Sequence, residues 1–67
     1  MIEVTVNGEV RRIAAGATVA ALLDQMQLAG KRIAVERNGE IVPKSLHGAV
    51  ALTAGDKFEI VVAVGGG

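Results

Sequence analysis

The sequence predicts an α+β fold in which a mixed sheet of about five strands is covered on one face by one main helix. Three observations support this prediction. Residues 1–14 and 33–42 each alternate apolar and polar side chains around an Asn-Gly pair, the strongest short signal for a β-hairpin. Residues 18–28 between them carry the apolar spacing of one amphipathic helix. Residues 57–64 form a further alternating segment that is mostly apolar.

Composition limits the functions that a chain of this size can have. Its 67 residues make one small domain, and it contains no cysteine, which excludes disulfides, thiolate metal sites and a cysteine nucleophile. The lack of cysteine also fits a reducing, cytoplasmic location. Seven basic residues balance seven acidic ones and Phe58 is the single aromatic, so we expect binding to neither nucleic acid nor membranes.

The first hairpin turns at Asn7-Gly8, where a type I′ turn requires positive φ at both residues. A two-residue turn fixes the strand register. The expected pairs are Val6 with Glu9, Thr5 with Val10, Glu3 with Arg12 and Ile2 with Ile13. This register leaves Arg11 on the inner face, where a bulge or an edge position would let its charge reach water.

The helix is expected to begin after Thr18, whose hydroxyl suits an N-cap. One apolar stripe follows at helical spacing, formed by Val19, Leu22, Leu23 and Met26. Gly30 is the predicted C′ residue, because glycine adopts the left-handed conformation there at little cost. The stripe therefore predicts which helix face covers the sheet.

The second hairpin turns at Asn38-Gly39 and is expected to place Arg37 opposite Glu40 and Val35 opposite Val42. Pro43 confines the return strand to an edge or ends it. Residues 44–52 carry no clear period, and their apolar side chains are expected to cap the core from a loop or a short helical turn; they are Leu46, Val50 and Leu52.

The last strand is the most apolar and is therefore expected at the centre of the sheet, between the hairpins and parallel to the first strand. Its predicted inner face consists of Phe58, Ile60, Val62 and Val64. This arrangement is the ubiquitin-like β-grasp. The sequence thus predicts a single β-grasp domain over residues 1–64 and a flexible glycine tail over residues 65–67, which no side chain would keep out of a narrow channel.

Four features resemble the ThiS family, the sulfur carriers of thiamine thiazole synthesis. They are the length, the segment Ala34-Val35-Glu36-Arg37-Asn38-Gly39-Glu40-Ile41-Val42-Pro43, the turn Ala54-Gly55-Asp56 and the ending Val64-Gly65-Gly66-Gly67. The diglycine end is typical of the wider carrier class, and Val-Glu-Arg-Asn is the most specific run. Residues 44–50 carry no motif of the family.

The resemblance implies a carrier that is not itself an enzyme. A ThiF-like adenylyltransferase would use ATP and magnesium to adenylate the Gly67 carboxylate, with Gly65 and Gly66 threading into that partner. A sulfur donor such as a cysteine desulfurase would supply the sulfur of a thiocarboxylate, and a ThiG-like thiazole synthase would accept it. No cofactor or metal is expected on this chain, and we expect a monomer when it is free.

Three alternatives stay open from the sequence. The small subunit of molybdopterin synthase shares fold, tail and chemistry but is usually longer and richer in aromatic residues. A ubiquitin-like modifier would form isopeptide bonds with protein lysines. An interaction domain with an inert tail would neither carry sulfur nor form isopeptide bonds. Thiolation of the C-terminus separates a carrier from an inert domain, and lysine-linked conjugates identify a modifier.

A surface for partner docking is expected on the outer sheet face, because apolar patches on small proteins commonly mark interaction sites. Its predicted members are Val61, Ala63, Ile41 and Arg37. The charges at Glu36, Arg37 and Glu40 otherwise fit a solvated rim beside a turn. His47 has no second histidine or cysteine to assist it, and is therefore expected on a loop surface with no catalytic role.

Overall fold

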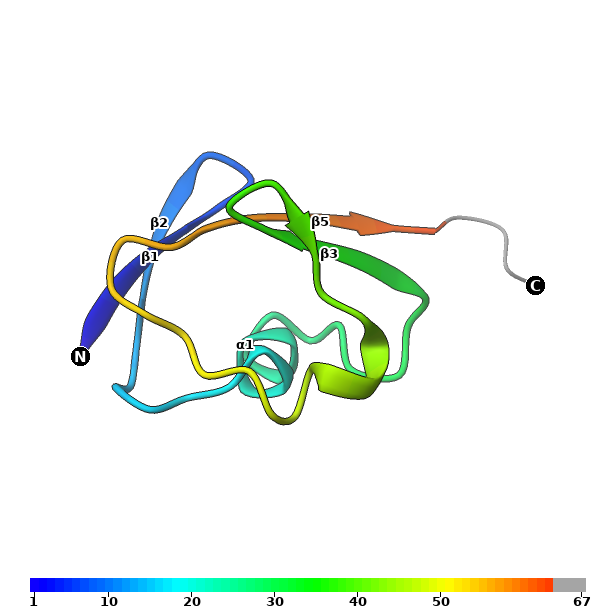
Figure 1. The fold of residues 1–67 in the computed structure, drawn as a ribbon, viewed down its shortest axis with the longest axis horizontal. Coiled ribbons are helices and arrows are strands. Elements are labelled where there is room, and N and C mark those ends of the chain that lie inside the picture. The colour runs from blue at the N-terminus through cyan, green and yellow to red at the C-terminus, as the bar shows by residue number, and fades with distance from the viewer. Residues whose placement is uncertain (64–67) are drawn as a thin grey trace.

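The computed structural model describes residues 1–63, and this part of the chain forms a five-stranded mixed sheet with one α-helix on one face (Figure 1). The elements are β1 (Ile2–Val6), β2 (Glu9–Ile13), α1 (Val19–Gln25), β3 (Ile33–Arg37), β4 (Glu40–Ile41), the short 3₁₀ turn η1 (Lys44–Leu46) and β5 (Lys57–Val62). The strand order is β2-β1-β5-β3-β4. The predicted ubiquitin-like β-grasp is therefore confirmed.

The β1–β2 hairpin has the register that its turn predicts, with all four expected pairs present. Asn7 and Gly8 have φ values of 50° and 84°, as a type I′ turn requires. Arg11 lies opposite Val4 on the inner side and is half-buried. Since β2 is an edge strand, the Arg11 side chain can extend past the sheet, which explains how a charge is tolerated there.

Strand β5 lies at the centre, parallel to β1 and antiparallel to β3, as predicted. Two turn asparagines hold it from opposite sides. Asn7 donates through Nδ2 to the Ile60 carbonyl (3.1 Å) and accepts the Ile60 N–H at Oδ1 (2.9 Å). Asn38 accepts the Lys57 N–H at Oδ1 (2.9 Å). Each Asn-Gly pair therefore has two roles. It forms the turn of its own hairpin, and its asparagine side chain bonds that hairpin to β5.

Helix α1 begins as predicted, with the Thr18 hydroxyl accepting the Ala21 N–H (3.3 Å). Its end differs from the prediction: the left-handed C′ residue is Gln27 (φ 61°), not Gly30. Leu28 N–H bonds to the Leu23 carbonyl (2.8 Å) and Gln27 N–H to the Asp24 carbonyl (3.0 Å), which is the Schellman pattern. Both Leu23 and Leu28 pack at the core, so their apolar contact decides where the helix ends.

The core lies between α1 and the inner face of the sheet. Its buried apolar residues are Val4, Val6, Ile13, Val19, Leu22, Leu23, Val35, Val42, Leu52, Phe58 and Ile60. Val62 was expected among them, but it is 38% exposed. Val62 is the last residue of β5, so it lies at the end of the strand, whereas the buried Phe58 and Ile60 lie further inside it. Val64 lies outside the described residues.

Residues 43–52 return the chain along the core. The edge strand β4 ends at Ile41, one residue earlier than expected, although Val42 N–H still bonds to the Val35 carbonyl (2.8 Å). Leu52 is buried, as predicted, whereas Leu46 is 45% exposed. No helix in the described part of the chain is long and apolar enough to cross a membrane.

His47 was expected on the surface, but it is only 8% exposed. Its Nε2 lies 3.0 Å from the Val42 carbonyl oxygen, and its own carbonyl accepts the Ala20 N–H (2.7 Å). The histidine thus connects the segment after β4 to the first turn of α1. This burial depends on the chain path from residue 43 to residue 52, which has no period in the sequence.

Candidate functional site

The residues expected to carry the chemistry, Gly65, Gly66 and Gly67, lie outside the described residues, as does the predicted domain boundary at Val64. The structure describes the strand that leads to them. Past the end of β5, the Ala63 N–H still bonds to the Arg32 carbonyl (2.9 Å). Pairing with the β3 side therefore continues to Ala63.

Three of the four predicted docking residues are exposed, and the strand register places two of them on the outer face. Val61 lies opposite Ala34, and Ile41 lies opposite Glu36, one strand further out. Val61 and Ile41 are each 63% exposed. Ala63 is exposed two residues beyond Val61 in the same alternation. These residues form an apolar part of the sheet surface on the side away from α1.

Arg37 does not belong to that surface. It lies opposite Phe58, which is buried against α1, so the alternation of the strand turns Arg37 to the inner side. Its Nε donates to Asp56 Oδ2 (3.0 Å) and its Nη2 to the Thr53 hydroxyl (3.1 Å). The side chain is 29% exposed. A contact between Arg37 and a partner remains a prediction.

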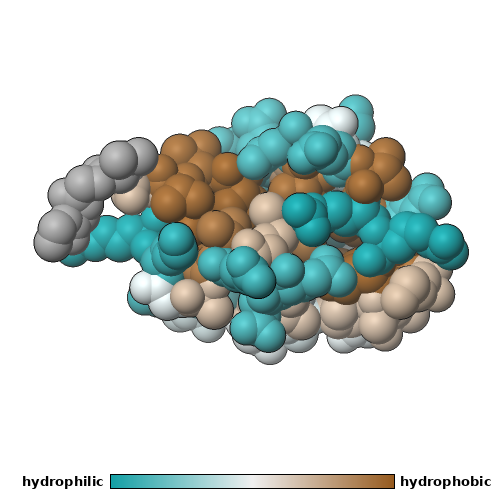
Figure 2. Space-filling model, turned by 180° about the vertical axis from the view of Figure 1, so that it is seen from behind, coloured by the Kyte–Doolittle hydropathy of each residue, from teal (hydrophilic) through white to brown (hydrophobic). Residues whose placement is uncertain are grey.

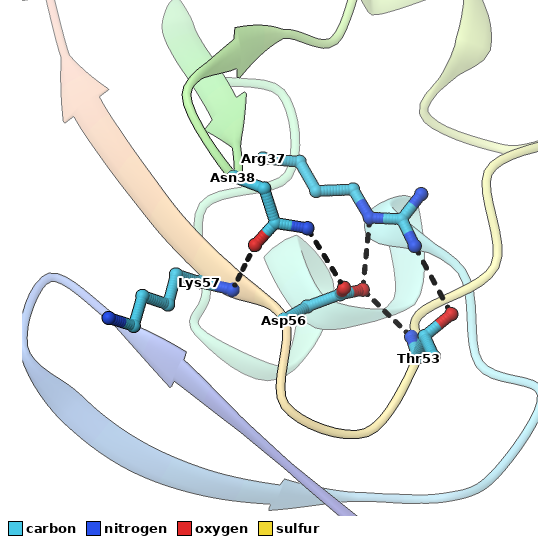
Figure 3. A network of polar contacts seen from close by, with 5 residues as sticks. All are labelled: Arg37, Asn38, Thr53, Asp56 and Lys57. Atoms are coloured by element: carbon cyan, nitrogen blue, oxygen red, sulfur yellow. Dashed lines mark hydrogen bonds and ion pairs between the residues drawn. The ribbon is translucent and has the colours of Figure 1, made fainter.

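Asp56 is the centre of a polar network that joins the second hairpin to the turn before β5 (Figure 3). Besides Arg37, it accepts the Thr53 N–H at Oδ2 (2.8 Å) and the Asn38 Nδ2 at Oδ1 (3.2 Å). Burial alone raises the pKa of the Asp56 carboxyl. The hydrogen bonds from Thr53, Asn38 and Arg37, with the positive charge of Arg37, outweigh that effect and lower its pKa below the ordinary value.

This network predicts a loss of stability in acid. Because the pKa of Asp56 is lower in the folded state, its contribution is complete above the unfolded pKa of about 3.9 and is lost as the pH falls through the folded value. Asp56→Asn should cost about 1–3 kcal/mol at neutral pH and should lack this part of the acid dependence. Urea unfolding between about pH 2 and pH 7 tests it.

The exposed Asp24→Asn variant, on α1, is the matched control and should follow the wild type. If the free energy of unfolding depends on pH in the same way for the wild type and for Asp56→Asn, the role given to Asp56 is contradicted. From the sequence, Asp56 is expected only in a turn. The spacing of Thr53 and Asp56 is a signal for a side chain that closes that turn, but the contact with Arg37 spans 19 residues and has no local signal.

The sequence of the chain is similar to that of a known protein family and to two named proteins. Residues 4–67 match the model of the ThiS family. The chain is 48% identical to thiazole synthase of Paramagnetospirillum magneticum and 38% identical to thiazole synthase of Magnetococcus marinus, in each case over 98% of the chain. The chain spans only 20% of the length of each of these relatives.

A solved structure has the same fold over almost the whole chain. It is the crystal structure of the thiamine biosynthesis protein ThiS from Geobacter metallireducens, with a TM-score of 0.81 and 30% identity. The match covers 98% of this chain and 100% of that one. The order of hairpin, helix, hairpin and central strand is thus shared with a protein of the same size class.

Proposed function

The chain belongs to the ThiS family, and we propose from this that it is a sulfur carrier for thiamine thiazole synthesis. Its working group is the carboxylate of Gly67, which a ThiF-like partner adenylates and a sulfur donor converts to a thiocarboxylate. The observation that carries the proposal is the family match, which extends from Val4 through the terminal glycines. The chain acts as a co-substrate of its partners, which bind the ATP and magnesium.

The chemistry begins with activation, because a carboxylate is a poor electrophile. A Gly67 carboxylate oxygen attacks the α-phosphorus of ATP, and pyrophosphate leaves, giving an acyl-adenylate. Sulfur at the oxidation level of sulfide then attacks the carbonyl carbon, and AMP leaves. If a desulfurase persulfide delivers the sulfur, the product is an acyl disulfide, which a thiol must reduce to release the thiocarboxylate.

The carrier keeps reactive sulfur bound to protein until a ThiG-like thiazole synthase accepts it. Glycines at positions 65 and 66 suit this role because they add no side chain beside the reacting carboxylate. The chain contains no cysteine, so the thiols that the sequence of steps needs belong to the partners. The β-grasp domain then serves as the surface by which each partner holds and aims the tail.

Intact-mass measurement of the wild type tests the proposal directly. After incubation with ATP, magnesium, the adenylating partner and a sulfur source, the protein should gain the mass difference of sulfur replacing oxygen. Fragmentation should place that change on Gly67. Sulfur on another residue, or no modification while lysine-linked conjugates form, would contradict the carrier function and would identify, in the second case, a protein modifier.

The outer-face residues Val61, Ala63 and Ile41 are proposed to dock the adenylating partner. Arg37, which turns to the inner side of the sheet, is proposed as a further contact. Val61→Asp should weaken that binding at least about fivefold, because it places an unpaired charge in a desolvated contact. The fold should remain, since Val61 is 63% exposed. Calorimetric titration with the partner measures the effect.

Val10→Asp is the matched control for this prediction. Val10 is 66% exposed and carries the same side chain, but it lies on the edge strand β2, on the far side of β1 from β5. It should bind the partner like the wild type. If Val61→Asp retains wild-type affinity, the outer face around Val61 is not the docking surface.

A further inference from the structure

An open groove lies at the end of the sheet where β3 begins and β5 ends. Its volume is about 430 Å³, and the loop after α1 forms one of its walls. The apolar part of its lining comes from Leu23, Leu28, Ile33, Ala34, Val61 and Ala63. Figure 2 shows apolar surface gathered at the left of the view, which is the end of the molecule where β5 ends in Figure 1.

Three cations border the groove, namely Lys31, Arg32 and Lys44, and all three are exposed. Among residues 1–63 the ion pair within 4.0 Å is that between Arg37 and Asp56, so none of the three cations has an acidic partner there. The whole chain has a formal net charge of zero, which makes this concentration of positive charge a local property of the groove.

The combination defines the kind of group that the groove would bind. An apolar floor favours an apolar side chain, and the bordering cations favour carboxylates on either side of it. In the free protein an open groove costs little free energy. Water solvates the bordering cations, and the residues of the apolar floor are only partly accessible. A segment with both features would gain from burial and from charge complementarity at once.

We propose that this groove docks an acidic, apolar segment of the thiazole synthase that receives the sulfur. The inference rests on the proposed function. The choice of partner comes from the relatives named thiazole synthase, in which a domain like this one makes up 20% of a longer polypeptide. In those proteins the domain and the rest of the chain are held together covalently, which gives a contact between them a high effective concentration.

The groove overlaps the surface proposed for the adenylating partner, because Val61 and Ala63 also line it. Two partners that need the same residues cannot bind together. The carrier must therefore leave the adenylating partner before this groove can dock the thiazole synthase. The adenylating partner should accordingly compete with the thiazole synthase in a binding assay.

The test compares two charge reversals with equal change in net charge. Lys44→Glu alters the groove, whereas Arg12→Glu alters an exposed cation on edge strand β2. Lys44→Glu should weaken binding to the thiazole synthase about fivefold to tenfold at low salt. The difference should shrink in about 1 M salt, where the screening length falls to about 3 Å. Arg12→Glu should stay within about twofold of the wild type, and both variants should keep the melting temperature of the wild type.

Nuclear magnetic resonance of the labelled carrier provides a second readout. Titration with the thiazole synthase should shift the amides of Gly30, Ile33 and Lys44 more than those of β2. Equal weakening by both variants, or shifts confined to β2, would overturn the inference. If the wild type still forms the Gly67 thiocarboxylate in that case, the groove assignment fails and the carrier function stands; if no thiocarboxylate forms, the carrier function itself fails.

Discussion

Deleting Gly66 and Gly67 is expected to abolish thiocarboxylate formation while leaving the melting temperature nearly unchanged. The deletion withdraws the carboxylate by two residues, up to about 7 Å of reach. A misplacement of about one ångström can cost about a hundredfold in rate, so a shift of this size should stop adenylation. The two deleted residues are glycines, so no side chain is lost, which is why stability should hardly change.

Gly66→Val separates the effect of tail length from the effect of side-chain bulk, because it keeps the full length of the tail. A branched side chain restricts the backbone and blocks a channel that admits only glycine, so this variant should also stay unmodified. Each variant and the wild type are incubated with the partner, ATP and a sulfur source, and the intact mass of each protein is then measured. Acquisition of sulfur by the shortened protein would refute the assignment of the reacting group to Gly67.

Truncating Leu22 is expected to have the largest effect on stability. Leu22 is fully buried at the centre of the core, and Leu22→Ala removes three carbon atoms there and leaves a cavity. Such changes cost about 2–5 kcal/mol. A domain of this size has roughly 3–5 kcal/mol of net stability, so the variant should lose much or all of it. Thermal and urea unfolding followed by circular dichroism measure the loss.

Leu46→Ala is the matched control, since it makes the same chemical change at a side chain that is 45% exposed. It should cost well under half as much as Leu22→Ala, because less apolar surface leaves the protein interior. Equal losses at the two positions would show that burial does not determine the cost. An unchanged melting temperature for Leu22→Ala would contradict the helix register itself.

Local patterns were enough to predict the sheet. The two-residue turn at Asn7-Gly8 leaves one possible register, and the structure has that register throughout β1 and β2. The apolar alternation of residues 57–62 placed β5 at the centre for a physical reason, since a strand buried between neighbours has the least contact with water. Thr18 and the stripe from Val19 placed α1 in the same way.

The features that sequence reasoning missed all depend on contacts between distant segments. His47 is buried because the irregular segment after β4 passes beneath the first turn of α1. The Asp56 network joins the turn before β5 to Arg37 across 19 residues. The helix ends at Gln25, with Gln27 as its left-handed C′ residue, because Leu28 packs at the core just beyond it. Neither a period nor a turn rule encodes such contacts.

The position of β5 also determines the order in which the domain can fold during synthesis. The ribosome makes this strand after both hairpins, yet neither hairpin pairs with the other except through it. The contacts between Asn7 and Ile60 close a loop of 53 residues, and non-local pairings of this kind slow folding. The two hairpins and α1 must therefore wait, without a shared core, until Val62 has left the exit tunnel. Until then the nascent domain exposes its apolar strand faces, which is when chaperone binding or aggregation would compete with folding.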